Sequence, residues 1–216
     1  MSRPRRITDD QILATMRASV LEHGPSVSLD VVAAELGVTG PALLHRFGSR
    51  QALLLKALMP PAEAPFVADL DAGPDDRPFA EQLESVLMRV SDHFSAIAPC
   101  MSALRESGIA QATLAEAKPG PLRSVQAFYR WLLRARDLGL VAAADHELET
   151  AATAILGAMH SHAMMAHIYK EALSTRPAVE HAHDLARLFA RALGATTARR
   201  PTHEDPSHRP SGPIVL

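Results

Sequence analysis

The sequence is poor in the features that mark an exported or membrane-bound protein. Its single cysteine, Cys100, leaves no intramolecular disulfide to form, so an oxidising compartment gains no support. No apolar run approaches the roughly 20 residues that a membrane-spanning helix requires. The basic first residues lead into Thr8, Asp9 and Asp10 and not into an apolar signal segment. We therefore expect a soluble, cytoplasmic protein without a membrane partner.

Net charge is also nearly absent, and a formal value of −2 does not by itself indicate a nucleic-acid partner. The distribution of charge is more informative. Residues 1–56 hold seven basic and five acidic residues, whereas the remaining residues hold 15 basic and 19 acidic ones. A basic N-terminal part beside an acidic remainder suits a protein that turns one surface towards phosphate.

Aromatic residues make up only 4% of the chain, and alternating β-branched runs are missing. Ala, Leu, Arg and Glu dominate instead, and apolar residues recur at helical spacing, which predicts an all-α fold. Capping residues and Gly or Pro stops set the expected bounds, with Pro99 ending one helix. The predicted helices are residues 9–23, 29–36, 40–47, 50–59, 79–97, 100–108, 121–137, 145–173 and 178–193.

Composition divides the chain into parts. Residues 59–78 are rich in Pro, Ala and Asp, which predicts a linker. It separates an N-terminal domain, residues 1–58, from a larger helical domain, residues 79–194. Residues 195–216 show no periodicity, and we expect them to be a disordered tail.

Residues 28–53 have the pattern of a helix-turn-helix, in which two short helices cross at a steep angle. Ala33 is the small residue that the crossing requires, and Gly37 suits the left-handed backbone of the turn. Thr39 can cap the second short helix, and Pro41 falls in its first turn, where a missing N–H costs little. The apolar residues that would hold both helices against the first helix are Val32, Leu36, Val38, Leu43 and Phe47.

The side of the 40–47 helix left exposed is the surface that helix-turn-helix proteins insert into the major groove. Its residues are Gly40, Pro41, Ala42, Leu44, His45 and Arg46. The predicted phosphate contacts and helix caps at this interface are Arg46, Arg50, Lys56, Ser28 and Thr39. A basic arm that could reach an adjacent groove is formed by Arg3, Arg5 and Arg6. The alternative is an ordinary helical hairpin whose cations are merely solvated.

The segment resembles the helix-turn-helix of the tetracycline-repressor (TetR) family of bacterial transcriptional regulators. That family has a small residue and Gly-Val, a polar cap, a Leu-Tyr pair, a Phe, and a Ser-Lys-x-x-Leu run into the fourth helix. The residues in register with this pattern are Gly37, Val38, Thr39, Leu43, Phe47 and 49–53. The match covers residues 8–56, and beyond it only helix number and total length agree.

Three positions depart from the family pattern. Leu44 stands where Tyr is usual, which removes a familiar phosphate or base contact. Pro41 replaces a small residue, and Arg50 replaces Lys while keeping a cation with bidentate geometry. The exposed face is therefore poor in hydrogen-bonding groups. We expect readout through thymine methyl groups and His45, or through DNA shape.

The resemblance implies that the larger domain dimerises, because one helix-turn-helix reads only a few base pairs. A homodimer built from the last two helices of each subunit would bind a palindromic operator in double-stranded DNA. Residues 151–166 are dense in small residues and Met, which allows close helix approach. The matching apolar stripe is Leu185, Leu188, Phe189 and Leu193. The alternative is that both helices are buried within a monomer.

The resemblance also implies a small-molecule pocket whose ligand lowers DNA affinity, which makes the protein a repressor released by its ligand. The candidate lining residues are Met88, Phe94, Met101, Phe128, Trp131, His160 and Met164. Their apolar character predicts an apolar or amphipathic ligand and no cofactor. For each of them, plain core packing is the alternative.

Other functions find less support in the sequence. The eleven histidines include no pair at i, i+3 or i, i+4 spacing on the predicted helices 145–173 and 178–193, so we expect no metal site. Cys100 has apolar neighbours, which favours inert packing over redox sensing. No phosphate loop, nucleophile elbow or HExxH motif is present, so we expect no enzyme. The remaining alternatives are a helical dimer with a degenerate, non-binding head, and a small all-helical enzyme.

Overall fold

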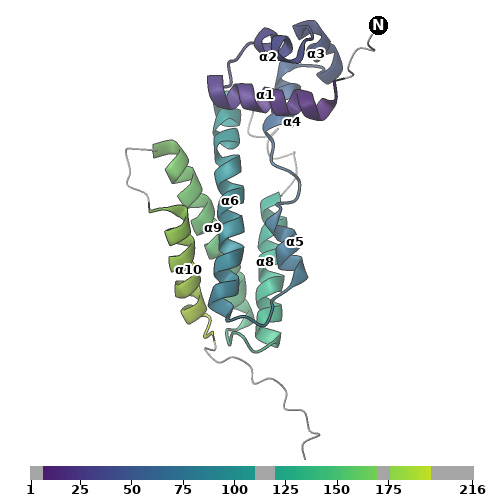
Figure 1. Ribbon diagram of the computed structural model, residues 1–216. Helices are drawn as coiled ribbons and strands as arrows, with labels where there is room; N and C mark the ends of the chain where they lie inside the picture. Colours follow the sequence, from purple (N-terminus) through teal and green to yellow (C-terminus); the bar gives the residue numbers. More distant parts are fainter. Residues whose placement is uncertain (1–6, 110–119, 170–175, 196–216) are drawn as a thin grey trace, which may run out of the picture.

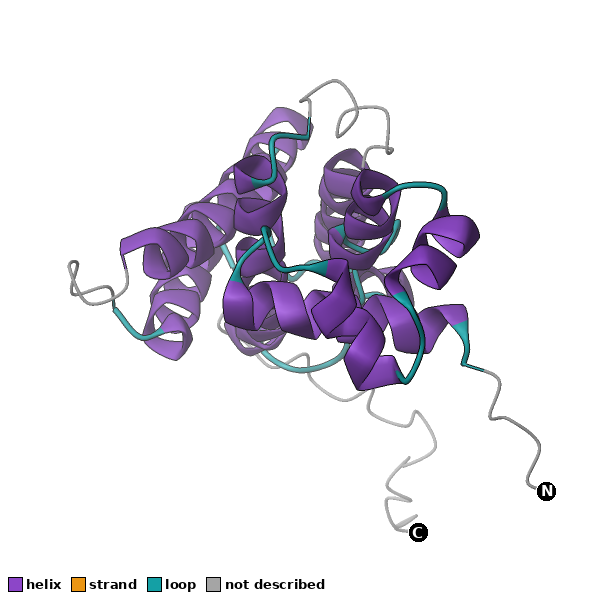
Figure 2. Cartoon of the chain, turned by 90° about the horizontal axis from the view of Figure 1, so that it is seen from above, coloured by secondary structure: helices purple, strands orange, loops and turns teal. Residues whose placement is uncertain are grey.

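The structure is a computed structural model that describes residues 7–109, 120–169 and 176–195. Within these residues every regular element is an α-helix and no strand is present (Figure 2). The predicted all-α fold is therefore confirmed. No helix in the described ranges combines the length and the apolar character needed to cross a bilayer.

The helices form two groups, one seated on the end of the other (Figure 1). The N-terminal group consists of α1 (Asp9–His23), α2 (Leu29–Leu36), α3 (Gly40–Phe47) and α4 (Arg50–Leu58). The larger group consists of α5 (Phe66–Ala72), α6 (Phe79–Glu106), α8 (Gly120–Asp137), α9 (Asp145–Tyr169) and α10 (Ala178–Ala192). Helix α6 runs the length of the larger group and reaches the N-terminal group (Figure 1).

Helix α1 begins at the cap that the sequence predicts. The Thr8 hydroxyl accepts a hydrogen bond from the Gln11 backbone N–H, and the Gln11 side chain accepts one from the Thr8 N–H, which completes a capping box. Asp9 and Asp10 occupy the first turn, where the helix dipole favours negative charge. These interactions are local and fix the start of α1.

The core of the N-terminal group also includes residues of α6. Ile12 and Met16 of α1 pack with Leu53 and Leu54 of α4, and all four are almost completely buried. The same cluster takes in three residues near the C-terminal end of α6, namely Cys100, Ala103 and Leu104. Helix α6 is therefore shared by the two groups and joins them through packed side chains.

Helix α6 corrects the prediction that Pro99 ends a helix. The helix continues through Pro99 to Glu106, as one element of 28 residues. A proline inside a helix costs about 3 kcal/mol. Ala98 and Cys100 on either side of it are buried, and burial of this end of the helix in the N-terminal core offsets the cost.

The expected linker, residues 59–78, is likewise corrected, because it contains α5. Phe66, Val67 and Leu70 of this helix are buried in the core of the larger group. Arg134 of α8 donates hydrogen bonds to the backbone carbonyls of Leu70 and Asp71 at the C-terminal end of α5. A seven-residue helix gives too short an apolar pattern to stand out from the surrounding Pro and Asp residues.

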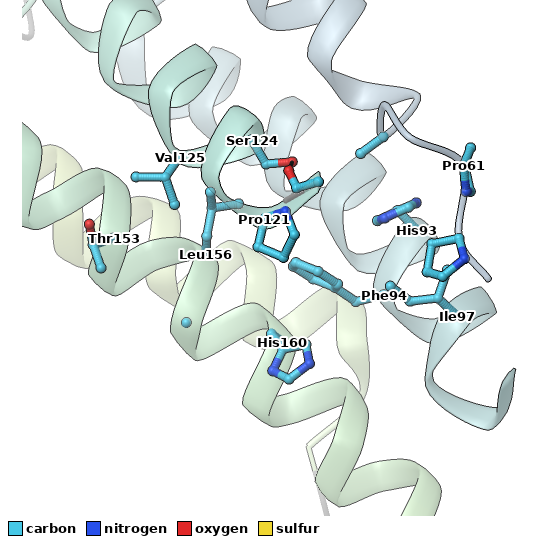
Figure 3. Close-up of a pocket in the computed structure, with 14 residues that line it drawn as sticks. Pro61, His93, Phe94, Ile97, Pro121, Ser124, Val125, Thr153, Leu156 and His160 are labelled. Carbon is cyan, nitrogen blue, oxygen red and sulfur yellow. Dashed lines mark hydrogen bonds between the residues drawn. The ribbon is translucent and has the colours of Figure 1, made fainter. Parts of the chain in front are cut away.

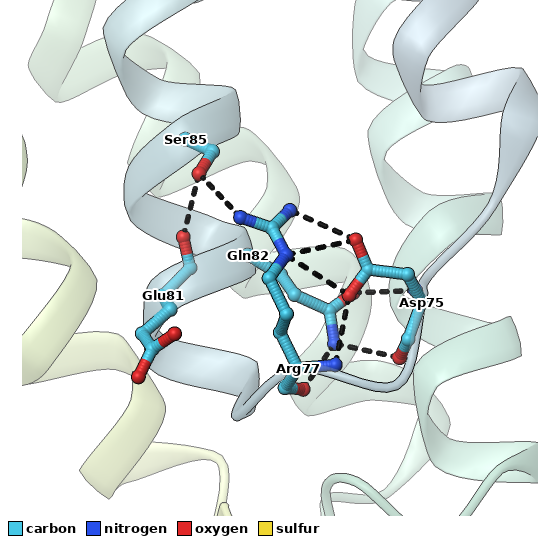
Figure 4. Close-up of polar contacts among 5 residues, drawn as sticks. All are labelled: Asp75, Arg77, Glu81, Gln82 and Ser85. Atoms are coloured by element: carbon cyan, nitrogen blue, oxygen red, sulfur yellow. Dashed lines mark hydrogen bonds and ion pairs between the residues drawn. The ribbon is translucent and has the colours of Figure 1, made fainter.

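The loop between α5 and α6 is held by a buried amide (Figure 4). Gln82 is only 3% exposed, and its Nε2 donates to the carbonyls of Asp75, at 2.8 Å, and Arg77, at 2.5 Å. Its Oε1 accepts from the Asp75 N–H at 2.7 Å. Arg77 in turn pairs with the Asp75 carboxylate and lowers the pKa of that group through this hydrogen bond. The network fixes where α6 begins.

The core of the larger group lies between α5, α6, α8, α9 and α10. Trp131 and Phe128 of α8 are fully buried there, and the Trp131 ring stacks on Phe79 at 5.5 Å. Ala182, Ala186 and Ala190 recur every four residues on α10, which allows its backbone to pack closely on the neighbouring helices. The long helices expected at residues 121–137, 145–173 and 178–193 correspond to α8, α9 and α10.

Some predictions fall on residues that the structure does not describe. These are the basic arm of Arg3, Arg5 and Arg6, the end of the predicted 145–173 helix, and all of the predicted tail except Ala195.

Candidate DNA interface and ligand pocket

The candidate DNA-reading surface is the exposed side of α3. Thr39 caps this helix by accepting a hydrogen bond from the Ala42 N–H at 3.4 Å. Leu43 and Phe47 are buried, which orients the helix with its other side towards solvent. The residues on the exposed side are Pro41, Ala42, Leu44, His45 and Arg46. Leu44, which is 39% exposed, gives this surface an apolar side chain with no hydrogen-bonding group.

Gly40 was predicted on this surface, but the structure buries it. A Cβ at this position would lie 2.6 Å from the Asp30 Oδ1 of α2. The glycine therefore serves the close approach of α2 and α3. Gly37, at φ 67°, provides the left-handed turn between them, as the sequence predicts.

Each residue predicted to contact phosphate has a partner within the module formed by α1 to α4 and the residues that flank them. Arg46 forms a 2.5 Å ion pair with Asp9 and donates a hydrogen bond to the Ile7 carbonyl at 2.8 Å. Arg50 donates to the carbonyls of Pro25 and Val27, the latter at 3.0 Å, and so ties α4 to the loop between α1 and α2. Contact of Arg46 and Arg50 with phosphate stays a prediction.

Lys56 lies with its Nζ 5.6 Å from the centre of the Phe47 ring, within the range of a cation–π contact. Its side chain is exposed, so the ammonium group remains accessible to solvent. Its contact with phosphate stays a prediction as well.

Helix N-termini supply further anion-binding groups. Ser28 caps α2 by accepting from the Asp30 N–H at 3.1 Å, and Ser49 caps α4 by accepting from the Ala52 N–H at 3.1 Å. With Thr39 on α3, three capped N-termini carry the positive end of a helix dipole, which suits phosphate. Ser49 lies in the run 49–53 that matches the family pattern, but it was not predicted as a member of the DNA-binding set.

A cavity of about 370 Å³ lies in the larger group, between α6, α8, α9 and the chain that follows α4 (Figure 3). Its volume falls within the roughly 300–1,000 Å³ of small-molecule sites. The lining residues are Pro60, Pro61, Ala64, His93, Phe94, Ile97, Gly120, Pro121, Ser124, Val125, Thr153, Leu156, Gly157 and His160.

The structure brings two of the seven predicted pocket residues to this cavity, Phe94 and His160. Phe128 and Trp131 are core residues, fully buried beside it. Met88 packs on the same core, whereas Met101 packs on the N-terminal core. Met164 is not among the residues that line the cavity.

The cavity wall that sequence reasoning missed is formed partly by residues of the α4–α5 segment and by His93. A hydrophobic stripe identifies the buried side of a helix, but it does not separate side chains that meet other side chains from those that meet a cavity.

The polar groups of the cavity are few. Ser124 and Thr153 donate their hydroxyl hydrogens to the Gly120 and Glu149 carbonyls one turn earlier, each at 3.2 Å. The imidazoles of His93 and His160 lie on either side of Phe94, with ring centres 5.5 and 5.3 Å from it. Burial lowers the pKa of both imidazoles, and Arg105 lowers that of His160 further. Both shifts favour the neutral form of the imidazole.

Other histidines meet across helices, which same-helix spacing could not reveal. His162 of α9 and His181 of α10 stack at 4.2 Å between ring centres, and His183 lies 3.0 Å from the Glu84 carboxylate. In the described ranges no three His, Cys, Asp or Glu side chains are grouped so that they could hold a metal ion. Burial raises the pKa of the Cys100 thiol, which keeps it protonated.

Exposed apolar side chains gather on the last two helices. At the end of α9, Ile168 and Tyr169 are 54% and 43% exposed, and on α10 Val179 and Leu188 are 56% and 51% exposed. The predicted dimer stripe divides, because Leu193 is buried within the subunit while Leu188 is exposed. Leu185 and Phe189 are partly buried against the subunit's own core.

Known proteins match the N-terminal helices in sequence and most of the chain in fold. Residues 12–57 match the sequence profile of the bacterial regulatory proteins of the tetR family. No curated protein matches the chain in sequence.

Solved structures resemble the chain over most of its length. One is described as a TetR-family transcriptional regulator, from Mesorhizobium loti. It is 14% identical with a TM-score of 0.69, and the match covers 87% of this chain and 96% of that one. A protein solved in a study of the control of antibiotic production by bacterial hormones is 24% identical with a TM-score of 0.62, over 88% and 100% of the chains.

The fatty acid degradation regulator FadR from Bacillus halodurans is 13% identical with a TM-score of 0.58, over 87% and 97% of the chains. Identities this low establish the fold alone. The profile match adds the module formed by α1 to α4. The helix-turn-helix of this chain is similar to that of the bacterial regulatory proteins of the tetR family, and the chain is a DNA-binding transcriptional regulator with the fold of TetR-family regulators.

Proposed function

We propose that the protein is a homodimeric repressor that binds a palindromic operator and is released by a small apolar or amphipathic molecule. The observation that carries this proposal is that the cavity and the DNA-binding module share helix α6. His93, Phe94 and Ile97 of α6 line the cavity, and within two further turns Cys100 and Leu104 enter the N-terminal core.

A second connection joins the cavity to the module. Pro60 and Pro61 line the cavity and are separated by Met59 alone from Leu58, the last residue of α4, which is itself buried in the N-terminal core. A ligand that moves α6 or these prolines would therefore move α4, and with it α3. Because cores are close-packed, such a shift is transmitted and not absorbed.

Two observations support dimerisation: the small size of one helix-turn-helix and the exposed apolar residues of the last two helices. One helix-turn-helix contacts a few base pairs, and two half-sites one helical turn apart, about 34 Å, need two heads held at fixed spacing. The exposed Val179 and Leu188 of α10 and Ile168 of α9 provide apolar surface for a second subunit.

The nature of the ligand is supported by the lining. Ile97, Val125 and Leu156 face the cavity, and no acidic, lysine or arginine side chain lines it within the described residues. Among the similar structures one is a fatty acid degradation regulator, which is consistent with an apolar ligand in such a fold.

The proposal is tested by fluorescence anisotropy with labelled duplexes from the DNA upstream of the protein's own gene. We expect tight, sequence-selective binding that weakens as salt rises. Equal binding to every duplex, or none, would contradict the DNA-binding part. The ligand part is tested by adding 1-octanol, octanoic acid or octylamine and looking for release of the DNA.

A matched pair of variants locates the response. Gly157 lines the cavity and has free space around its Cβ position, so Gly157→Leu fills part of the cavity. Ala96→Leu adds a similar bulk at an exposed position on α6, outside the lining of the cavity. We expect only the first change to abolish release while DNA binding remains. Release that survives Gly157→Leu would place the ligand elsewhere.

A further inference from the structure

The aromatic row formed by His93, Phe94 and His160 gives the cavity a defined polar chemistry. The His93 ring lies edge-on to Phe66, at 5.5 Å and 72°, and the His160 ring lies edge-on to Phe94, at 5.3 Å and 80°. Phe66 is 1% exposed, so it is a fixed support. The His93 ring is thus oriented before any ligand arrives, and the exposed His160 ring rests against Phe94.

The hydrogen-bonding capacity of these two rings is unused. No hydrogen bond to a ring nitrogen of His93 or His160 occurs within the part of the chain that the structure describes. By contrast, the hydroxyl hydrogens of Ser124 and Thr153 are bonded within their own helices. A neutral imidazole presents one donor and one acceptor. Two such rings from facing helices offer a molecule in the cavity both kinds of partner.

The cavity also lacks a partner for charge. Its described lining contains no Asp, Glu, Lys or Arg, and Arg105, which lowers the pKa of His160, is exposed and does not line it. Moving an ammonium or carboxylate group into such a site is unfavourable without a counter-charge. A hydroxyl or carbonyl group costs far less and is satisfied by a single hydrogen bond.

We propose that the cavity selects an uncharged molecule with an apolar body and one hydroxyl or carbonyl group, which His93 and His160 bind by hydrogen bonds. The apolar body lies against Ile97, Val125 and Leu156, and the polar group lies beside Phe94, on which both rings converge (Figure 3). This assignment rests on the proposed ligand response and names the chemistry that the same site takes.

The test uses displacement of the neutral dye Nile red from the full-length protein at pH 7.5, with 1-octanol, octanoate and octylammonium as competitors. The three share one apolar chain and differ only in the head group. We expect 1-octanol to bind at least about tenfold more tightly than either ion. Octanoate or octylammonium binding as tightly as 1-octanol would overturn the proposal, as would failure of 1-octanol to displace the dye.

Variants assign the effect to the two rings. His93→Phe and His160→Phe keep an aromatic ring and remove the hydrogen bond, so each should weaken 1-octanol binding roughly 2- to 10-fold. His146→Phe, at an exposed position near the start of α9, is the control and should leave it unchanged. Unchanged affinity in both cavity variants would overturn the roles of the two histidines. Dye binding that persists in Gly157→Leu would show that the dye sits elsewhere and would overturn the assignment to this cavity.

DNA release separates this inference from the proposed function. If 1-octanol binds selectively but none of the three compounds releases DNA, the cavity chemistry holds and the ligand response fails. If only octanoate or octylammonium releases DNA, the response holds and the chemistry assigned to the cavity fails.

Discussion

Replacing Arg50 by alanine should destabilise the DNA-binding module, in addition to any loss of phosphate contact. The guanidinium group donates to the carbonyls of Pro25 and Val27, in a partly buried position that joins α4 to the loop between α1 and α2. A hydrogen bond from a charged donor contributes about 1.5–3 kcal/mol. Here one nitrogen serves both carbonyls and solvent screens the pair, so we expect a loss of about 1–3 kcal/mol in total.

The assay is urea unfolding followed by circular dichroism, together with a thermal scan. For a chain of this size the loss should lower the melting temperature by roughly 2–12 °C. Arg46→Ala is the control, because its ion pair with Asp9 and its hydrogen bond to the Ile7 carbonyl are both exposed and together should contribute at most about 1 kcal/mol. Arg50→Lys keeps a cation for phosphate but lacks the planar fork, so it should retain DNA affinity better than stability. If Arg50→Ala unfolds like the wild type and loses DNA binding, the intramolecular bonds contribute nothing and the reasoning is wrong.

Two further predictions follow from pKa shifts and from the exposed apolar residues. Because burial lowers the pKa of His93 and His160 in the folded state, the unfolded chain takes up protons first as the pH falls below about 6.5. The free energy of unfolding should therefore decrease below that pH, and the double variant His93→Phe/His160→Phe should show a shallower decrease in urea titrations. Leu188→Asp should convert the proposed dimer to a monomer in analytical ultracentrifugation, whereas Leu122→Asp, at a similarly exposed site on α8, should leave it dimeric.

The helix-turn-helix could be predicted from the sequence almost residue by residue, because its signals are local. The Thr8, Ser28, Thr39 and Ser49 caps act within three residues of themselves, and Gly37 fixes a turn by its own backbone. Such interactions are the same in a short segment as in the folded chain. Gly40 shows the limit of this reasoning, since its burial depends on Asp30 in another helix.

Partner choice of the long charged side chains could not be predicted. Arg46 and Arg50 sit at positions where a free cation would suit phosphate, yet each finds a carbonyl or carboxylate within the module. Which acceptor lies within reach of a guanidinium group depends on how α1, α3 and α4 pack. Sequence spacing carries no information on that geometry.

An apolar pocket in the larger group could be predicted from the sequence, but only some of the residues that line it. Phe94 and His160 were identified, whereas Trp131 and Phe128 fill the core beside the cavity. All four lie on the apolar sides of their helices, so periodicity treats them alike. His93 was missed because it lies beside the apolar stripe of α6 that includes Val90 and Phe94, and not on it. It packs against Phe66, a contact that the sequence does not reveal, and it lines the cavity.

Pro99, which was predicted to end a helix, instead lies at the point where α6 bends most easily. Because proline has no N–H, the Ser95 carbonyl lacks its partner in the helical ladder at this turn. The position falls between Ile97, which lines the cavity, and Cys100, which belongs to the N-terminal core. Helix α6 is thus easiest to bend between the cavity and the N-terminal core, because a bend there breaks the fewest backbone hydrogen bonds. A force applied by a ligand at Ile97 would bend α6 here, and the packed end beyond Cys100 would carry α4 and α3 with it as a unit.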